Sequence, residues 1–142
     1  GYPRDEMVAL YLAADVMLVT ALRDGMNLVA KEYVASRFDE DGVLILSEFT
    51  GASDELKRAL LINPPDIDAL KDAILAAIAM PRRERASRMR TLRRRVHEFD
   101  VARWSADFLT TLDQAKRGRF QRMSPTELVD ELEWTLDSRK AH

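Results

Sequence analysis

The sequence contains no cysteine, and its net charge at neutral pH is only −2. The absence of cysteine excludes a disulfide framework and a thiolate metal site, and it fits the reducing cytoplasm, which is the expected location. The small net charge excludes a general electrostatic attraction to nucleic acid. No apolar run reaches the roughly 20 residues that a membrane-spanning helix needs, so we expect no membrane association.

Histidine is scarce as well, since His97 and His142 are the only two among 142 residues. His97 falls in the last turn of a predicted helix, where a partly charged imidazole suits the helix dipole. No group of histidines and carboxylates has the spacing of metal ligands. We therefore expect no metal and no cofactor.

Hydrophobic residues make up 46% of the sequence and charged residues 32%, an ordinary globular mixture. Three short apolar runs, at residues 15–20, 43–46 and 60–63, predict buried strands. Helical patterns separate these runs. The order predicts an α/β fold with three parallel strands, joined by right-handed crossovers and flanked by helices.

The helical segments carry apolar residues at helical spacing. Helices are expected at residues 4–14, 28–35, 56–59, 66–80, 82–99 and 100–112. Asp66 is predicted to cap the fourth helix, and Ser53 or Asp54 the third. The apolar stripes predicted to be buried are Met7, Leu10, Tyr11 and Ala14; Ile67, Leu70, Ile74 and Ile78; Met89, Leu92, Val96 and Phe99; and Val101, Trp104, Phe108 and Leu112.

Residues 113–142 differ in kind from the rest of the chain. Residues 116–122 are expected to form a basic loop. Ser124 and Glu127 then show the capping-box pattern. This predicts an amphipathic closing helix with an apolar side made of Leu128, Leu132 and Leu136, with Trp134 near one edge.

Eight arginines lie between residues 82 and 95. They suggest a surface that binds nucleic acid. However, Met89, Leu92 and Val96 assign one face of this helix to the core, and no aromatic residues are interleaved with the arginines. A solvated helix face is the preferred interpretation, and we expect no nucleic-acid partner.

The stretch from residue 20 to residue 33 joins the first predicted strand to the second predicted helix. Asp24, Gly25 and Asn27 are residues that tolerate the unusual backbone angles of a tight turn. A helix N-terminus at the carboxyl end of a buried strand binds anions, phosphates above all. Glu32 lies one helical turn past Leu28 on the same face, where a carboxylate could accept ribose hydroxyls. The alternative is a turn that binds nothing, with Asp24 as a simple helix cap.

Residues 23–33 read Arg-Asp-Gly-Met-Asn-Leu-Val-Ala-Lys-Glu-Tyr. They closely resemble the donor-site signature of the trehalose-6-phosphate synthases, which are retaining glycosyltransferases of the GT-B fold. The resemblance covers roughly residues 2–112 and continues through residues 47–52, 61–64 and 100–104. Ala21 departs from it, where the family usually has proline, and so does Thr50, where the family usually has alanine.

The resemblance implies the second half of a Rossmann-like GT-B carboxyl-terminal domain, and we expect the chain to be the last third of a longer enzyme. Residues 1–112 would be the donor-binding half of that domain, and residues 113–142 a basic loop and helical extension. The strand at residues 15–20 would then lie at an edge of the sheet. The apolar side chains expected to be left uncovered are Val16, Leu18, Val43 and Ile45.

The resemblance also implies roles for single residues. Asp24, the catalytic candidate, would bind the hydroxyls of the donor glucose. The backbone amides of Gly25, Met26 and Asn27 would help to hold this sugar. The amides of Leu28 and Val29 would face the diphosphate, and Glu32 would bind the ribose. Ala30 and Lys31 complete the donor-binding motif, and the side chain of Lys31 could instead point to solvent.

The activity implied is the transfer of glucose from UDP-glucose to glucose-6-phosphate, which gives trehalose-6-phosphate with retention and without a metal. The arginine and lysine that stabilise the leaving diphosphate, and the domain that binds the acceptor, are not in this chain. We therefore expect it to be inactive alone. Expected partners are the remainder of the enzyme or another chain that completes the sheet, and the full enzyme is expected to be a homo-oligomer.

Two alternatives stay open from the sequence. One is a related enzyme with the same donor half, either a glucosylglycerol-phosphate synthase or a pseudo-glycosyltransferase. The other is a non-catalytic, regulatory subunit that resembles a trehalose synthase. The intact signature from Arg23 to Glu32 argues against the second.

Overall fold

The computed structural model describes residues 2–99 and 101–120. The chain divides into two compact units, Gly1–Asp100 and Val101–His142. The first unit contains the sheet and five helices, and the second begins with a long helix. Each unit is described by itself.

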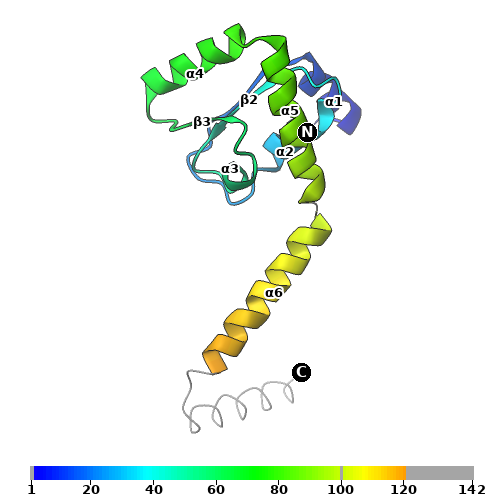
Figure 1. The fold of residues 1–142 in the computed structure, drawn as a ribbon, viewed down its shortest axis with the longest axis vertical. Coiled ribbons are helices and arrows are strands. Elements are labelled where there is room, and N and C mark those ends of the chain that lie inside the picture. Colours follow the sequence, from blue (N-terminus) through cyan, green and yellow to red (C-terminus); the bar gives the residue numbers. More distant parts are fainter. Residues whose placement is uncertain (1, 100, 121–142) are drawn as a thin grey trace. The chain divides into compact units, whose positions relative to one another are not determined.

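Three strands form the sheet of the first unit (Figure 1). They are parallel and lie in the order β1-β2-β3. The strands are β1 (Val16–Val19), β2 (Val43–Ser47) and β3 (Leu60–Ile62). Val16 pairs with Val43 at one end of β1, and Ile45 pairs with Leu60 across the other interface. The predicted three-stranded parallel sheet is confirmed, and the carboxyl ends of the strands share one edge.

One face of the sheet is covered by helices α1 (Arg4–Ala13), α2 (Leu28–Ser36) and α5 (Arg82–Glu98). Every residue of β2 is buried, as expected for a continuous apolar strand in the centre of a sheet. The core on this side combines side chains from all three helices with those of β1 and β2. Its largest members are Tyr11, Tyr33, Leu44, Leu46, Leu56, Met89 and Leu92.

Helix α4 (Ile67–Ala79) covers the opposite face of the sheet. Val43 and Ile45 are fully enclosed there, so the prediction that they lie uncovered is wrong. Val16 is partly buried in the same cluster. Leu18, on edge strand β1, is 42% exposed, which confirms the prediction for this residue.

The predicted buried stripe of α4 is correct in its middle and wrong at its ends. Asp66 caps the helix as predicted, with its side chain accepting from the N–H of Ala69 at 2.9 Å. Leu70 and Ile74 pack against the sheet, but Ile67 and Ile78 are 62% and 67% exposed. The residues that complete the contact are the small Ala73 and Ala77, which allow the helix to lie close to the strands.

The predicted helix at residues 56–59 is wrong. The structure has helix α3 (Ala52–Glu55) instead, which starts four residues earlier. Ser53 does not cap a later helix. Its hydroxyl donates to the carbonyl of Thr50 at 2.7 Å instead, so the chain turns into the helix directly after residue 51.

The second unit begins with helix α6 (Val101–Phe120), described here alone. The predicted start at residue 100 and the predicted closing helix around Leu132 lie outside the described residues. The predicted basic loop is wrong for residues 116–120, which are helical. Lysine and arginine are good helix formers, and one interior glycine, Gly118, costs a helix only about 1 kcal/mol. Of the helices in the two described ranges, none is long and apolar enough to cross a membrane.

Candidate functional site

The turn after β1 is organised by the carboxylate of Asp24. Its Oδ1 accepts from the backbone N–H of Met26 at 3.1 Å and of Asn27 at 2.9 Å. Its Oδ2 accepts from the Asn27 side chain at 2.9 Å. These donors favour the charged form and lower the pKa of Asp24, with the Met26 N–H contributing most. Asp24 therefore does hold the turn, as the alternative interpretation expected.

Asn27 begins helix α2 and takes the unusual backbone angle of this turn. Its φ is +57°, in the left-handed region that asparagine tolerates. Its side-chain oxygen accepts from the N–H of Ala30 at 2.9 Å, which is a helix N-cap. The sequence pointed to Gly25 as well, yet Gly25 is not among the described residues with positive φ.

A second turn, at the carboxyl end of β2, lies directly against the first. Asp24 and Thr50 form an isolated parallel bridge, in which the N–H of Gly51 donates to the carbonyl of Asp24 at 2.9 Å. A side chain at Gly51 would collide with the backbone of Gly25, since an added Cβ would lie 2.1 Å from its carbonyl oxygen. Thr50 is buried with its hydroxyl bonded to the Ser47 carbonyl, so the departure from alanine is accommodated.

Gly25 is unlike Gly51, because a Cβ added there would meet no atom of residues 2–99 and 101–120 within 4 Å. Neither a left-handed conformation nor close packing within the chain requires glycine at this position. The space beside it is open, at the edge where the strands end.

The first turn of α2 presents two N–H groups without a partner inside the helix, those of Leu28 and Val29. The N–H groups on either side donate to side chains of the turn. The N–H of Asn27 donates to the Asp24 carboxylate, and the N–H of Ala30 donates to the Asn27 side-chain oxygen. Ala30 is also fully buried, which leaves it no side chain or N–H to offer a ligand. The amides of Met26 and Asn27, predicted to hold the sugar, are likewise engaged by Asp24.

The side chain of Lys31 pairs with Glu55 at the end of α3. Its Nζ lies 2.7 Å from Glu55 Oε2, and the side chain is 15% exposed. The pair joins α2 to α3. Lys31 is therefore engaged by Glu55 and does not extend into solvent.

Glu32 lies beside a cavity of about 550 Å³ between α1 and α2. Its Oε2 accepts a hydrogen bond from the hydroxyl of Tyr11 at 3.0 Å. The cavity is open to solvent and mixed in chemistry, with a charged side chain from each helix. Its lining residues are Tyr2, Arg4, Met7, Val8, Tyr11, Glu32, Ala35 and Ser36.

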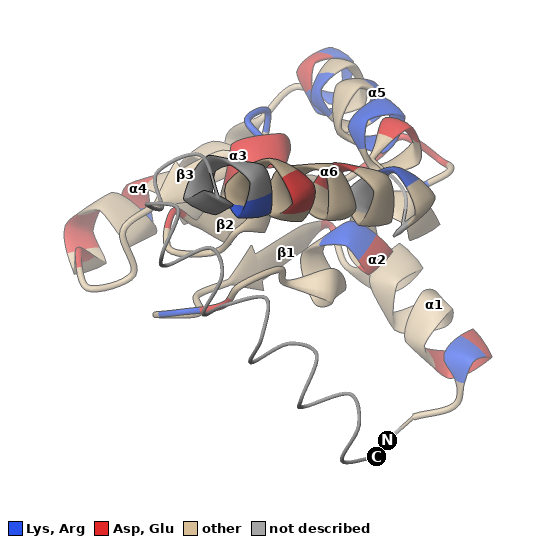
Figure 2. Ribbon diagram, turned by 90° about the horizontal axis from the view of Figure 1, so that it is seen from below, with Lys and Arg blue, Asp and Glu red and all other residues tan. Residues whose placement is uncertain are grey.

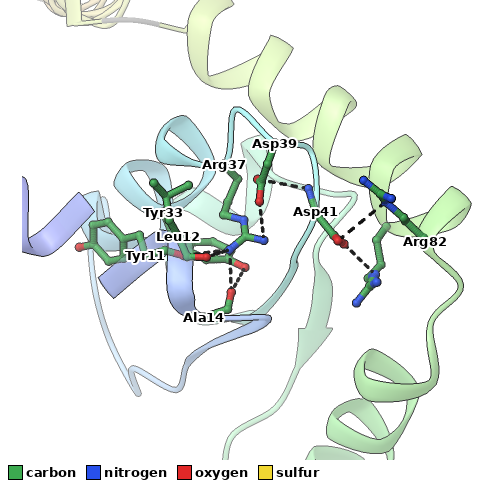
Figure 3. A network of polar contacts seen from close by, with 9 residues as sticks. Tyr11, Leu12, Ala14, Tyr33, Arg37, Asp39, Asp41 and Arg82 are labelled. Atoms are coloured by element: carbon green, nitrogen blue, oxygen red, sulfur yellow. Dashed lines mark hydrogen bonds and ion pairs between the residues drawn. The ribbon is translucent and has the colours of Figure 1, made fainter. Parts of the chain in front are cut away.

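Arg37, which the sequence did not single out, fixes α1 against α2 (Figure 3). It is only 2% exposed, and its Nη1 donates to three carbonyl oxygens at the end of α1, those of Tyr11, Leu12 and Ala14. Its Nη2 pairs with Asp39 at 3.0 Å. The guanidinium therefore caps the C-terminus of α1, which positions the wall of the cavity.

The arginines of α5 are largely matched by carboxylates. Figure 2 shows the mixture of positive and negative residues along this helix. Arg85 pairs with Asp41 at 3.0 Å, and Arg90 pairs with Glu40 at 2.8 Å. Such pairing supports the solvated-face interpretation. Across residues 2–99 and 101–120, no three histidine or carboxylate side chains gather as metal ligands do.

Comparison with known proteins decides the family. The profile described as glycosyltransferase family 20 matches residues 2–114. The chain belongs to glycosyltransferase family 20. It is 58% identical over 113 residues to the trehalose-6-phosphate synthase of Mycobacterium leprae, and 59% identical over 110 residues to that of Mycolicibacterium smegmatis. These matches cover 80% and 78% of this chain, but only 23% and 22% of the relatives.

Solved structures of this family match the fold as well. The trehalose-phosphate synthase of Burkholderia xenovorans in complex with glucose-6-phosphate is 46% identical, with a TM-score of 0.74. The Escherichia coli protein bound with UDP-2-fluoro glucose is 42% identical, also with a TM-score of 0.74. Each match covers 80% of this chain, and 25% and 26% of the respective structure. The predicted GT-B fold class and the predicted family are confirmed.

Proposed function

We propose that this chain is the donor-binding part of a retaining glucosyltransferase. The full enzyme transfers glucose from UDP-glucose to glucose-6-phosphate, in the cytoplasm, and releases trehalose-6-phosphate. One observation carries the proposal: in a family 20 chain, α2 begins at the carboxyl end of a parallel strand, and Glu32 of the same helix lines a cavity between α1 and α2. The carboxyl end of the strands is where α/β sheets bind nucleotides.

The diphosphate belongs at the N-terminus of α2. The N–H groups of Leu28 and Val29 lack intrahelical partners, and the helix dipole adds a partial positive charge there. Glu32 lies one turn further along α2, so its carboxylate is placed to accept hydrogen bonds from the ribose hydroxyls. The cavity that Glu32 lines then has room for the uracil base.

The glucose belongs beside Asp24 and Gly25. A carboxylate has about four acceptor sites, and three hydrogen bonds within the turn occupy three of those of Asp24. One site remains for a glucose hydroxyl. The open space beside Gly25 lets a sugar approach the backbone closely.

The rest of the reaction requires the remainder of the enzyme. That part would supply the acceptor site, the cationic side chains that stabilise the leaving diphosphate, and a neighbour for edge strand β1. We expect the full enzyme to be a homo-oligomer. The named relatives are all trehalose-6-phosphate synthases, which favours this reaction over the glucosylglycerol-phosphate, pseudo-glycosyltransferase and regulatory alternatives.

Calorimetry with UDP on the full-length enzyme tests the ribose assignment. Replacing Glu32 by alanine should weaken UDP binding by about 1.5–3 kcal/mol, the range for hydrogen bonds to a charged group. The matched control is Asp72→Ala, which removes an exposed carboxylate from α4 and should leave the affinity unchanged. Equal affinity in wild type and Glu32→Ala would refute the assignment.

A further inference from the structure

Tyr11 holds a side chain that would otherwise be mobile. Glu32 is exposed, and an exposed glutamate on a helix samples several rotamers, which costs free energy when a ligand orders it. The Tyr11 hydroxyl donates to Glu32 Oε2 at 3.0 Å from a position 21 residues earlier in the chain. This hydrogen bond removes part of that freedom before any ligand arrives.

Tyr11 is itself held on a rigid support. It is 5% exposed, and its ring packs edge-on against the ring of Tyr33, with centroids 6.2 Å apart and an interplanar angle of 77°. Its backbone carbonyl accepts from Arg37 Nη1 at 3.1 Å, as Figure 3 shows. The position of its hydroxyl is therefore set by the packing of α1 on α2.

The hydroxyl stays a donor across the neutral range. Burial is the largest cause that raises the pKa of Tyr11, and the hydrogen bond to Glu32 and the negative charge of Glu32 raise it further. Glu32 Oε2 thus has a donor at neutral pH. Its Oε1 is left to accept from a ligand.

We propose that Tyr11 is a positioning residue that presets the Glu32 carboxylate for the 2′- and 3′-hydroxyls of a ribose. The inference rests on the ribose role proposed above for Glu32 and goes beyond it. A carboxylate that is already oriented favours a ribose over a deoxyribose. When the sugar lacks a hydroxyl, the fixed carboxylate loses a hydrogen-bond partner, and this lowers the binding affinity. Tyr11 then contributes to the selectivity for ribose over deoxyribose without touching the nucleotide's reacting atoms.

The test compares UDP with 2′-deoxy-UDP by calorimetry on the full-length enzyme. Tyr11→Phe keeps the ring and removes only the hydroxyl. We expect UDP affinity to fall about fivefold to tenfold, the effect of one hydrogen bond, while 2′-deoxy-UDP affinity changes less. The preference for UDP should therefore shrink.

Tyr33→Phe is the matched control. It removes a buried hydroxyl from the same helix interface, one that donates to the Ala14 carbonyl and not to Glu32. A purely structural role of Tyr11 would make the two variants alike. We expect Tyr33→Phe to keep the wild-type preference for UDP over 2′-deoxy-UDP.

A double-mutant cycle separates this inference from the proposed function. Adding Tyr11→Phe to Glu32→Ala should cause no further loss of UDP affinity, because Tyr11 acts through Glu32. If Glu32→Ala abolishes the preference for UDP and Tyr11→Phe leaves it intact, the positioning role is wrong and the ribose role of Glu32 stands. If Glu32→Ala itself leaves both affinities unchanged, the ribose assignment fails, and the inference fails with it.

Discussion

The N–H of Gly51 donates to the carbonyl oxygen of Asp24 at 2.9 Å, which joins the turn after β1 to the turn after β2. The two turns support each other at the edge of the sheet where the strands end. Because they are in contact, the geometry of the candidate sugar site depends on residues far from it in sequence.

The two glycines of these turns should respond differently to alanine. Gly51→Ala places a Cβ 2.1 Å from the Gly25 carbonyl oxygen, and relieving this clash should cost about 1–3 kcal/mol of unfolding free energy. Gly25→Ala meets no atom of the described residues within 4 Å and should change stability by less than about 0.5 kcal/mol. It should nevertheless weaken UDP-glucose binding. Denaturant melts and calorimetry on both variants check this, and a stable Gly25→Ala with unchanged donor affinity would contradict the sugar position.

Substitution of Asp24 should affect the use of the glucose group and not the binding of the nucleotide. Asp24→Ala should lower turnover with UDP-glucose while UDP binding stays nearly intact, because UDP has no glucose. Asp24→Asn keeps an oxygen that can accept from Met26 and Asn27, so it controls for the loss of the turn. If Asp24→Ala weakens UDP binding as much as Glu32→Ala does, Asp24 is only a structural cap.

Asp24 should also make the turn sensitive to acid. Its pKa is lowered in the folded protein, so its carboxylate stabilises the fold fully above the ordinary aspartate pKa of about 3.9. This contribution is lost as the pH falls through the lowered folded-state value. Unfolding measured between pH 6 and pH 2.5 should show a shallower acid decline in Asp24→Asn than in wild type. Identical slopes would show that the hydrogen bonds to Asp24 do not favour its charged form.

Among the arginines whose contacts the structure describes, Arg37 should be the most costly to replace. Arg37→Lys cannot satisfy three carbonyls and Asp39 with one ammonium, so we expect a loss of about 2–4 kcal/mol of unfolding free energy. Arg90→Lys is the control, because the pair of Arg90 with Glu40 is exposed and should contribute less than about 1 kcal/mol. Equal losses in denaturant melts would contradict the capping role.

The 142-residue chain expressed alone should associate. Strand β1 is an edge with Leu18 exposed, and α4 presents Ile67, Leu75 and Ile78 to solvent. Unpaired strand edges and apolar surface promote association. Light scattering should detect oligomers or aggregates. A monodisperse monomer that melts cooperatively would show that three strands and their helices suffice.

The strands could be predicted from sequence within about a residue, because β2 is a continuous apolar run buried on both faces. The buried face of α4 could be predicted only in part. Apolar residues lie on two adjacent arcs of this helix, one with Ile67 and Ile78 and one with Ala73 and Ala77. Periodicity does not say which arc faces the sheet, and the small residues make the closer contact.

The site was predictable as positions along the chain, but not as a set of contacts. The signature indicates Asp24 and Glu32, and the capping role of Asp24 was an open alternative. Contacts between distant residues carry no local signal. Tyr11 with Glu32, Lys31 with Glu55 and the Arg37 network are such contacts, as is the approach of Gly51 to Gly25.

A crystal structure of the full-length enzyme with UDP bound tests the central claim most directly. The account predicts the diphosphate against the N–H groups of Leu28 and Val29. It also predicts a ribose hydroxyl about 2.5–3.0 Å from the Glu32 carboxylate. UDP bound elsewhere, with Glu32 making no contact to it, would contradict the proposal that this chain is the donor-binding part of the enzyme.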